Sequence, residues 1–118
     1  MLTDLQRIEH MIENAELLLQ FSAHLTEAEF LASAEKQYAM KFAFVMLGED
    51  AASISESLKR KYPAVPWQSI RGMRNILAHD YSKTDEEFIW GAAVRDIEPL
   101  RQQFLCIKAE LEQPERRK

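Results

Sequence analysis

The chain has 118 residues, enough for one domain that buries roughly two thirds of its unfolded surface. Its only cysteine, Cys106, excludes an intramolecular disulfide and a cysteine-based metal site. The formal net charge of −4 argues against a general attraction for nucleic acid, and the longest nearly apolar run, residues 39–47, is too short to cross a bilayer about 30 Å thick. Charged residues stand among the first ten, where a signal segment would be apolar, so we expect a cytoplasmic protein with no membrane insertion.

The first predicted helix covers residues 4–24, where side chains suited to a buried face recur at steps of three and four. They form one stripe: Leu5, Ile8, Ile12, Ala15, Leu18, Leu19, Ser22 and Leu25. Thr3 and Gln6 have the spacing of a capping box, in which each side chain bonds the backbone N–H of the other residue. This box marks the start of the helix.

A second capping box, Thr26 with Glu29, predicts a short helix that ends at about Ala34. Residues 35–60 are expected to follow as one long helix whose centre is apolar on nearly every side, as in a central element with several neighbours. Gly48, in the middle of this helix, costs about 1 kcal/mol relative to alanine. We therefore expect either the close approach of another helix or a bend at that position.

Two prolines, Pro63 and Pro66, end the long helix and predict an extended connector. A fourth helix is expected to begin near Trp67. The last helical region covers residues 85–113. Pro99 should interrupt or kink this region, because the proline ring clashes with the preceding helical turn.

The chain as a whole is predicted to be helical. A third capping box, Thr84 with Glu87, marks the start of the last helical region, and the sequence shows no strand pattern, repeat or low-complexity tract. We predict an all-α fold, an antiparallel bundle of about five helices, built from residues 1–113 as a single domain. Residues 114–118 are expected to be a disordered tail.

The segment from Arg74 to Tyr81, RNILAHDY, carries the groups with the clearest chemical capacity. Arg74 offers a fixed guanidinium that can clamp phosphate oxygens in a bidentate manner. His79 offers an imidazole, a group that can take up and return a proton near neutral pH. Together with the phenol of Tyr81, these groups suit phosphodiester chemistry on RNA that needs neither a metal nor another cofactor.

The charge distribution supports this interpretation. Residues 59–79 include five basic side chains and no acidic one, whereas the rest of the chain has 10 basic and 19 acidic residues. Positive potential is what a phosphate backbone requires, and here it coincides with the motif. An alternative explanation for Lys59, Arg60 and Lys61 is that they complement the C-terminal dipole of the long helix.

A helical wheel divides the fourth helix into two sides. Four apolar residues share the sector expected to face the core: Ile70, Met73, Ile76 and Leu77. Four polar residues are expected to look away from it: Arg71, Arg74, Asn75 and His79. This arrangement is what a functional site requires, although any amphipathic helix places its polar residues in the same way.

Arg74 and His79 diverge on this helix. They lie about 140° apart around the axis and about 7.5 Å apart along it, too far to act together on one phosphate. A two-fold contact between two copies of the helix would bring Arg74 of one subunit toward His79 of the other. We therefore predict a homodimer.

The expected chemistry is metal-independent transesterification of RNA. His79 would remove the proton of a ribose 2′-hydroxyl or protonate the leaving 5′-oxygen, and the product would end in a 2′,3′-cyclic phosphate. Arg74 would stabilise the charge that grows on the phosphorus oxygens. Asn75 would orient the histidine or bind phosphate, Arg71 would support RNA binding, and Tyr81 would stack on a base. Considered alone, a histidine near a helix end more often caps backbone carbonyls.

The motif and its surroundings resemble the HEPN superfamily, and more narrowly its HepT-like branch, the toxin half of HepT/MntA-type toxin–antitoxin pairs. Three segments carry the resemblance: VMLGEDAASIS at 45–55, YPAVPWQSIRGMRNILAHDY at 62–81 and FIW at 88–90. The proline pair, the tryptophan and GMRN in register make it specific. Asp50 departs from the pattern, which has a small residue there, and this puts the local packing in question.

The resemblance implies a helical dimer with a composite cleft at its interface and an endoribonuclease that acts as a toxin. It also implies that a partner nucleotidyltransferase, an MntA-type antitoxin, transfers an adenylyl group to the hydroxyl of Tyr81 and blocks the cleft. A second hypothesis uses the same residues. In it, the protein is a non-catalytic adaptor that binds the nucleotidyltransferase or its nucleotide.

Other residues have structural interpretations. Glu49 lies within the apolar helix, where an unpaired carboxylate is costly, so we expect a partner such as Arg71 or Arg74. Trp67 and Trp90 are expected to be core or interface anchors rather than platforms for bases. The three histidines lack the spacing of metal ligands, so no metal site is predicted.

Overall fold

The computed structural model describes residues 1–79 and 85–113, except for the side chains at positions 76, 78 and 79. Within these residues it contains seven α-helices and no strand, which confirms the all-α prediction. The helices are α1 (Asp4–Ala23), α2 (Glu27–Leu31), α3 (Ala34–Ser53), α4 (Glu56–Lys61), α5 (Trp67–His79), α6 (Glu86–Arg95) and α7 (Ile97–Leu111).

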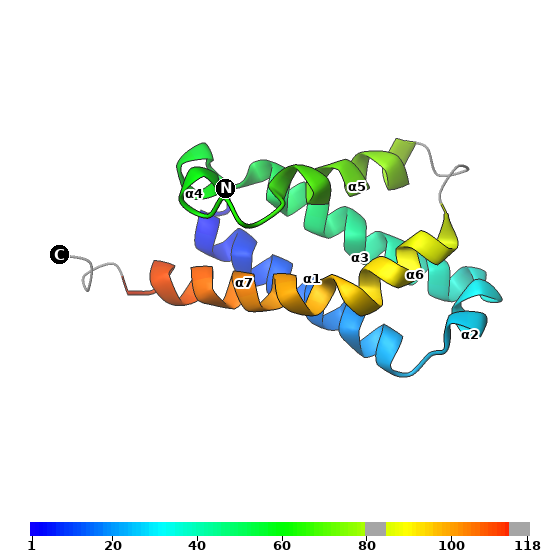
Figure 1. Ribbon diagram of the computed structural model, residues 1–118. Helices are drawn as coiled ribbons and strands as arrows, with labels where there is room; N and C mark the ends of the chain where they lie inside the picture. Colours follow the sequence, from blue (N-terminus) through cyan, green and yellow to red (C-terminus); the bar gives the residue numbers. More distant parts are fainter. Residues whose placement is uncertain (80–84, 114–118) are drawn as a thin grey trace.

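The long helices form an antiparallel bundle (Figure 1). Helix α3 packs against α1 on one side and α5 on the other, and α1 in turn packs against α7. The short helices α2 and α4 lie at opposite ends of α3 (Figure 1). Helix α5 therefore meets the bundle mainly through α3.

Helix α3 is the central element, as its apolar sequence predicts. It contacts α1, α2, α5 and α6, and its middle is largely buried. The buried residues are Met40, Lys41, Ala43, Phe44, Leu47, Gly48, Asp50 and Ala51. Tyr38 and Phe42 are nevertheless exposed, so one side of the helix remains open to solvent.

Two of the three predicted capping boxes are confirmed. Thr3 Oγ1 accepts a hydrogen bond from the Gln6 backbone N–H at 3.1 Å, and Gln6 Oε1 accepts one from the Thr3 N–H at 2.9 Å. Thr26 and Glu29 make the same pair of bonds at 3.1 and 2.9 Å. Helix α2 ends at Leu31, earlier than expected, because Ser33 already caps the start of α3.

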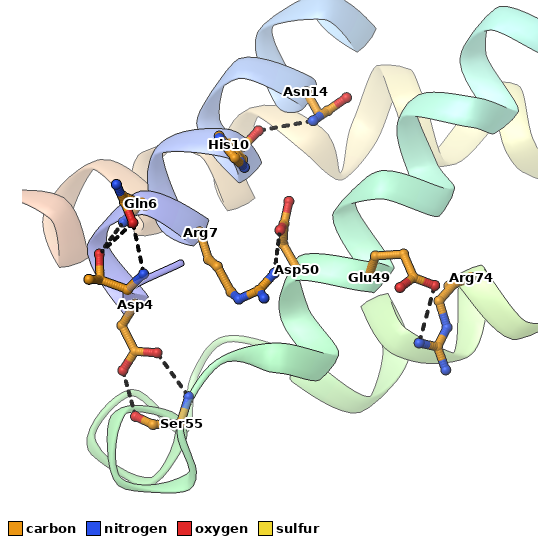
Figure 2. Close-up of polar contacts among 10 residues, drawn as sticks. Asp4, Gln6, Arg7, His10, Asn14, Glu49, Asp50, Ser55 and Arg74 are labelled. Carbon is orange, nitrogen blue, oxygen red and sulfur yellow. Dashed lines mark hydrogen bonds and ion pairs between the residues drawn. The ribbon is translucent and has the colours of Figure 1, made fainter. Parts of the chain in front are cut away.

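The single helix expected over residues 35–60 was wrong. Helix α3 ends at Ser53, and α4 begins after Ser55, whose hydroxyl accepts a hydrogen bond from the Leu58 N–H at 3.3 Å. Asp4, at the start of α1, accepts hydrogen bonds from the Ser55 N–H at 3.0 Å and from its hydroxyl at 2.6 Å (Figure 2). These hydrogen bonds stabilise the break between α3 and α4. They give the Ser55 N–H and hydroxyl an acceptor on α1, whereas in a continuous helix the N–H would bond a carbonyl of the preceding turn.

The last helical region breaks at a different place from the one predicted. Helix α6 ends at Arg95, and α7 begins after Asp96, before Pro99 is reached. Pro99 is thus in the first turn of α7, where its missing N–H has no helical partner to lose. The proline is compatible with the start of a helix and is not itself the kink.

Asp85 caps α6, accepting hydrogen bonds from the N–H groups of Glu87 at 2.9 Å and Phe88 at 3.3 Å. The third predicted capping box includes Thr84, which lies outside the described residues, as does the predicted tail at residues 114–118.

Two ion pairs that reach into the protein connect helices. Arg7 Nη1 of α1 lies 3.1 Å from Asp50 Oδ1 of α3, and Asp50 is only 4% exposed (Figure 2). Burial raises the pKa of Asp50, and the hydrogen bond from Arg7 opposes that rise. Lys41 Nζ of α3 lies 2.9 Å from Glu86 Oε1 at the start of α6. The acidic departure at position 50 is therefore accommodated by a basic residue on α1.

Candidate functional site

Gly48 determines how α5 sits on α3. A Cβ atom at this position would lie 2.9 Å from the backbone oxygen of Ile70 and would collide with the Cβ of Arg74. Only glycine leaves room for the α5 backbone here. The predicted close approach of another helix is confirmed, and the helix that approaches is the one that carries the motif.

The wheel prediction for α5 is confirmed for most of the described side chains. Ile70 and Leu77 are buried and Met73 packs against the core, whereas Arg71 and Asn75 are exposed. Arg74 departs from the prediction. Its stem lies over Gly48, and its side chain is only 22% exposed. Arg74 is therefore held at the margin of the contact between α3 and α5.

The guanidinium of Arg74 has two partners. Its Nε and Nη2 donate hydrogen bonds to Asn75 Oδ1 at 3.0 and 2.8 Å, and its Nη1 donates to Glu49 Oε1 at 3.4 Å (Figure 2 shows the Glu49 contact). An arginine has five N–H donors, two of them on each terminal nitrogen. Within the described residues, one N–H on Nη1 and one on Nη2 remain available. A guanidinium with a free donor on each terminal nitrogen can bind phosphate oxygens.

The role expected for Glu49 needs one correction. Its carboxylate pairs with Arg74, one of the two predicted partners, but its side chain is 53% exposed rather than buried among apolar residues. An ion pair this exposed is worth about 0 to 1 kcal/mol. The fold therefore does not depend on it, and the carboxylate is accessible from solvent beside the arginine.

The side chains of His79 and Tyr81, the other two residues of the predicted site, lie outside the described part of the structure. His79 is the last residue of α5, and its side chain lies outside what the structure describes. Tyr81 lies outside the described residues altogether. Because α5 extends unbroken from Arg74 to His79, the helical geometry that separates these two positions still applies.

The five basic residues of the 59–79 segment lie on two helices, α4 and α5. Lys59, Arg60 and Lys61 form the last turn of α4, near the start of α5 (Figure 1). His79 is at the other end of α5, about 18 Å away along the helix axis. Lys59 and Lys61 face Glu56 and Glu110 at 3.6 and 3.9 Å. Their position favours the helix-dipole explanation, although the helix concerned is α4.

An open groove of about 440 Å³ lies between α5 and the α6–α7 run. Its walls are mostly apolar, and they include Phe44, Ile70, Met73, Phe88, Ile97 and Leu100. Phe88 is 55% exposed. Arg74 does not line this groove, so the candidate site and the apolar groove are separate features of α5.

The described residues provide neither a metal site nor a membrane-spanning helix. No group of three or more histidine, cysteine, aspartate or glutamate side chains in residues 1–79 and 85–113 could hold a metal ion. In the same part of the chain, every helix is too short or too polar to cross a membrane.

The two tryptophans belong to the core, as predicted. Trp67 is buried, and Trp90 packs on Phe30, with ring centroids 5.5 Å apart.

Sequence reasoning missed two contacts around the site. The side-chain oxygen of Asn75 orients Arg74, a contact that was not predicted, and the role of Asn75 toward the histidine or a phosphate stays a prediction. Its position directly after the arginine was the available signal. Arg7, which compensates Asp50, lies 43 residues away along the chain, and nothing in the local sequence pointed to it.

Comparisons with known proteins agree on one family. The family model described as Ribonuclease HepT-like matches residues 11–107. A Thermococcus cleftensis protein named "Probable ribonuclease HepT" is 30% identical over 97 residues, which cover 82% of this chain and 88% of that protein. A candidate RNase of Methanocaldococcus jannaschii is 28% identical over 93 residues, 79% of this chain and 85% of that protein. No solved structure matches the chain significantly.

Proposed function

This chain belongs to the HepT-like ribonuclease family, and from that membership and the arrangement around Arg74 we propose that it is a toxin that cleaves RNA without a metal. The observation that carries the proposal is the guanidinium of Arg74. Asn75 and Glu49 hold it in place, and within the described residues its two terminal nitrogens keep one N–H donor each for the oxygens of a phosphate. RNA is the substrate class, and we expect it to be met in the cytoplasm.

The proposed reaction is an intramolecular transesterification. The 2′-hydroxyl of a ribose attacks the adjacent phosphorus, the bond to the 5′-oxygen breaks, and the upstream fragment ends in a 2′,3′-cyclic phosphate. His79 supplies proton transfer, which contributes roughly 10²- to 10⁴-fold. Arg74 stabilises the charge that develops on the phosphorus oxygens. Arg71, exposed one turn before Arg74, adds a further contact for the backbone of the RNA.

The test is incubation of the purified protein with RNA in EDTA, followed by analysis of the fragment ends. We expect cyclic-phosphate ends, and we expect them to disappear in His79→Ala and Arg74→Ala. His24→Ala is the matched control, because His24 is an exposed histidine at the end of α1, and this variant should cleave like the wild type. Cleavage that survives His79→Ala would contradict the assignment.

The alternative is a non-catalytic adaptor in which Arg74 only binds the nucleotidyltransferase or its nucleotide. The remaining N–H donors of Arg74 suit both functions, since a nucleotide also presents phosphate oxygens. The same assay separates them. RNA that stays intact at high concentrations of folded wild-type protein would favour the adaptor.

Regulation is proposed to act on Tyr81. A partner nucleotidyltransferase of the MntA type would place an adenylyl group on its hydroxyl, adding bulk and negative charge beside the groups that bind RNA. Tyr81→Phe removes the acceptor oxygen, so intact-mass analysis with the partner enzyme, ATP and magnesium should show no adduct. Tyr38→Phe, at an exposed tyrosine of α3, should still be adenylylated, as should the wild type. An adduct on the Tyr81→Phe variant would place the modification elsewhere.

A further inference from the structure

The carboxylate of Glu49 stands at the candidate site without a structural reason to be there. The exposed pair with Arg74 is long, at 3.4 Å, and contributes little to stability. Arg74 does not need it for orientation, because Asn75 Oδ1 accepts two shorter hydrogen bonds from the same guanidinium. Glu49 is thus an accessible anionic group that touches the residue proposed to hold the phosphate.

A carboxylate in this position meets the requirements for a general base. A base must reach the proton that it abstracts, within hydrogen-bond distance in a plausible substrate pose. In RNA, the 2′-hydroxyl lies next to the phosphate that it attacks. A phosphate bound by the terminal nitrogens of Arg74 would therefore bring its own 2′-hydroxyl to the neighbourhood of Glu49, which the same guanidinium contacts.

We propose that Glu49 is the general base of the reaction and that His79 serves only as the acid. This inference rests on the proposed ribonuclease function. A Glu49 carboxylate oxygen takes the 2′-hydroxyl proton as the bond from O2′ to phosphorus forms. The bond from phosphorus to O5′ breaks, and O5′ takes a proton from the imidazolium of His79. Water then removes the proton from Glu49 and returns one to His79, so the step needs no other reactant.

With this assignment, two of the three catalytic groups come from two helices of the same chain. Glu49 and Arg74 come from α3 and α5 of the same chain, joined where Gly48 lets the helices meet. The base and the phosphate clamp therefore belong to one subunit. His79, which diverges from Arg74 along α5, is needed for one proton transfer only.

Three variants test the proposal. Glu49→Gln keeps the size and the hydrogen-bond acceptor but cannot take a proton, and Glu49→Asp keeps the base on a shorter stem. Glu35→Gln removes the same charge from an exposed position in the first turn of α3 and is the matched control. The measurements are kcat and KM on RNA in EDTA, the pH dependence of the rate, and binding of 2′-O-methyl RNA, which lacks the nucleophile.

We expect kcat of Glu49→Gln to fall by roughly 10²-fold or more, with binding of 2′-O-methyl RNA unchanged or tighter. Its rate should then increase with pH, because hydroxide replaces the lost base. Glu49→Asp should recover part of kcat, and Glu35→Gln should match the wild type.

Two results would overturn the assignment. A Glu49→Gln enzyme with wild-type kcat shows that the residue is not a base. Tighter binding with unchanged kcat shows that it only competes with phosphate for Arg74. Both are distinct from failure of the proposed function, in which the wild type itself leaves RNA intact and Glu49 has no reaction to serve.

Discussion

At the scale of single residues, Gly48 has the largest structural consequence. Its missing side chain lets α5 lie against α3, so Arg74 and Glu49 come within hydrogen-bonding distance. In Gly48→Ala, the new Cβ would meet the Arg74 stem and the Ile70 backbone oxygen. Overpacking of this kind costs roughly 1 to 3 kcal/mol, which exceeds the gain of about 1 kcal/mol from replacing a helical glycine. We expect lower stability in urea unfolding and, because Arg74 shifts, lower ribonuclease activity.

Gly72→Ala is the matched control for that prediction. Gly72 is also in mid-helix, on α5, but a Cβ there would meet no atom of the described residues within 4 Å. The variant should gain up to about 1 kcal/mol from helix propensity alone. Equal stability changes in the two variants would mean that the contact between α3 and α5 is looser than described.

Asp50 predicts a dependence of stability on pH. Burial raises its pKa above the ordinary value of 3.8, despite the hydrogen bond from Arg7. The folded state therefore holds the proton at pH values where the unfolded state has lost it. The stability that Asp50 contributes is present below pH 3.8 and is lost as pH rises through the pKa of the folded state.

Asp50→Asn removes this dependence and keeps an oxygen for Arg7. Relative to this variant, the wild type should lose stability in urea unfolding as pH rises above 3.8. A difference that stays constant, or that grows in favour of the wild type, would contradict the prediction.

Some features of single residues at the site could not be predicted from the sequence. The sequence identified Arg74 by its type and spacing, and it offered Glu49 a partner on α5. It could not show which edge of the guanidinium is free, because that depends on the side-chain conformation of Asn75. The exposure of Glu49 was missed for a similar reason. An apolar sequence does not show which side of a central helix its neighbours leave uncovered.

At the scale of elements, local signals were predictive and long-range contacts were not. The starts of α1 and α2 follow from capping boxes, and the start of α5 follows from the prolines before it. The break between α3 and α4 does not follow from the local sequence, because the apolar pattern continues through Ile54 and Leu58. Its cause is Asp4, which lies 51 residues from Ser55 along the chain.

The break between α3 and α4 provides the element-scale prediction. Ser55→Ala removes the cap of α4 and the hydrogen bond from the Ser55 hydroxyl to Asp4, so it should cost about 1 to 2 kcal/mol of unfolding free energy. Asp4→Ala should cost less on its own, and the double variant should cost less than the sum, because the two residues share their interaction. Ser33→Ala is the control, since Ser33 caps α3 through Lys36 N–H at 3.2 Å. Additive effects of the Asp4 and Ser55 changes would show that the crossing contact contributes nothing.

At the scale of the whole molecule, two features of α5 favour a second copy of the chain. Arg74 and His79 diverge along the helix, so one chain cannot aim both at a single phosphate by helical geometry alone. The groove between α5 and the α6–α7 run is mostly apolar and open, with Phe88 exposed at its wall. Covering such a surface in a two-fold contact would remove apolar area from water. The homodimer remains a proposal, and its decisive test is functional.

If the site is composite, two inactive subunits should complement each other. An Arg74→Ala chain keeps His79, and a His79→Ala chain keeps Arg74, so a heterodimer of the two contains one cleft with both groups only if they act from opposite chains. The two variants carry different tags, are expressed together and are purified over both tags in sequence. We expect each homodimer to be inactive and the heterodimer to show about half of the wild-type activity, because one of its two clefts is complete. If both groups act from the same chain, every subunit of the heterodimer lacks one of them. A verified heterodimer without activity would therefore rule out the cross-subunit site, whatever the mass of the protein in solution.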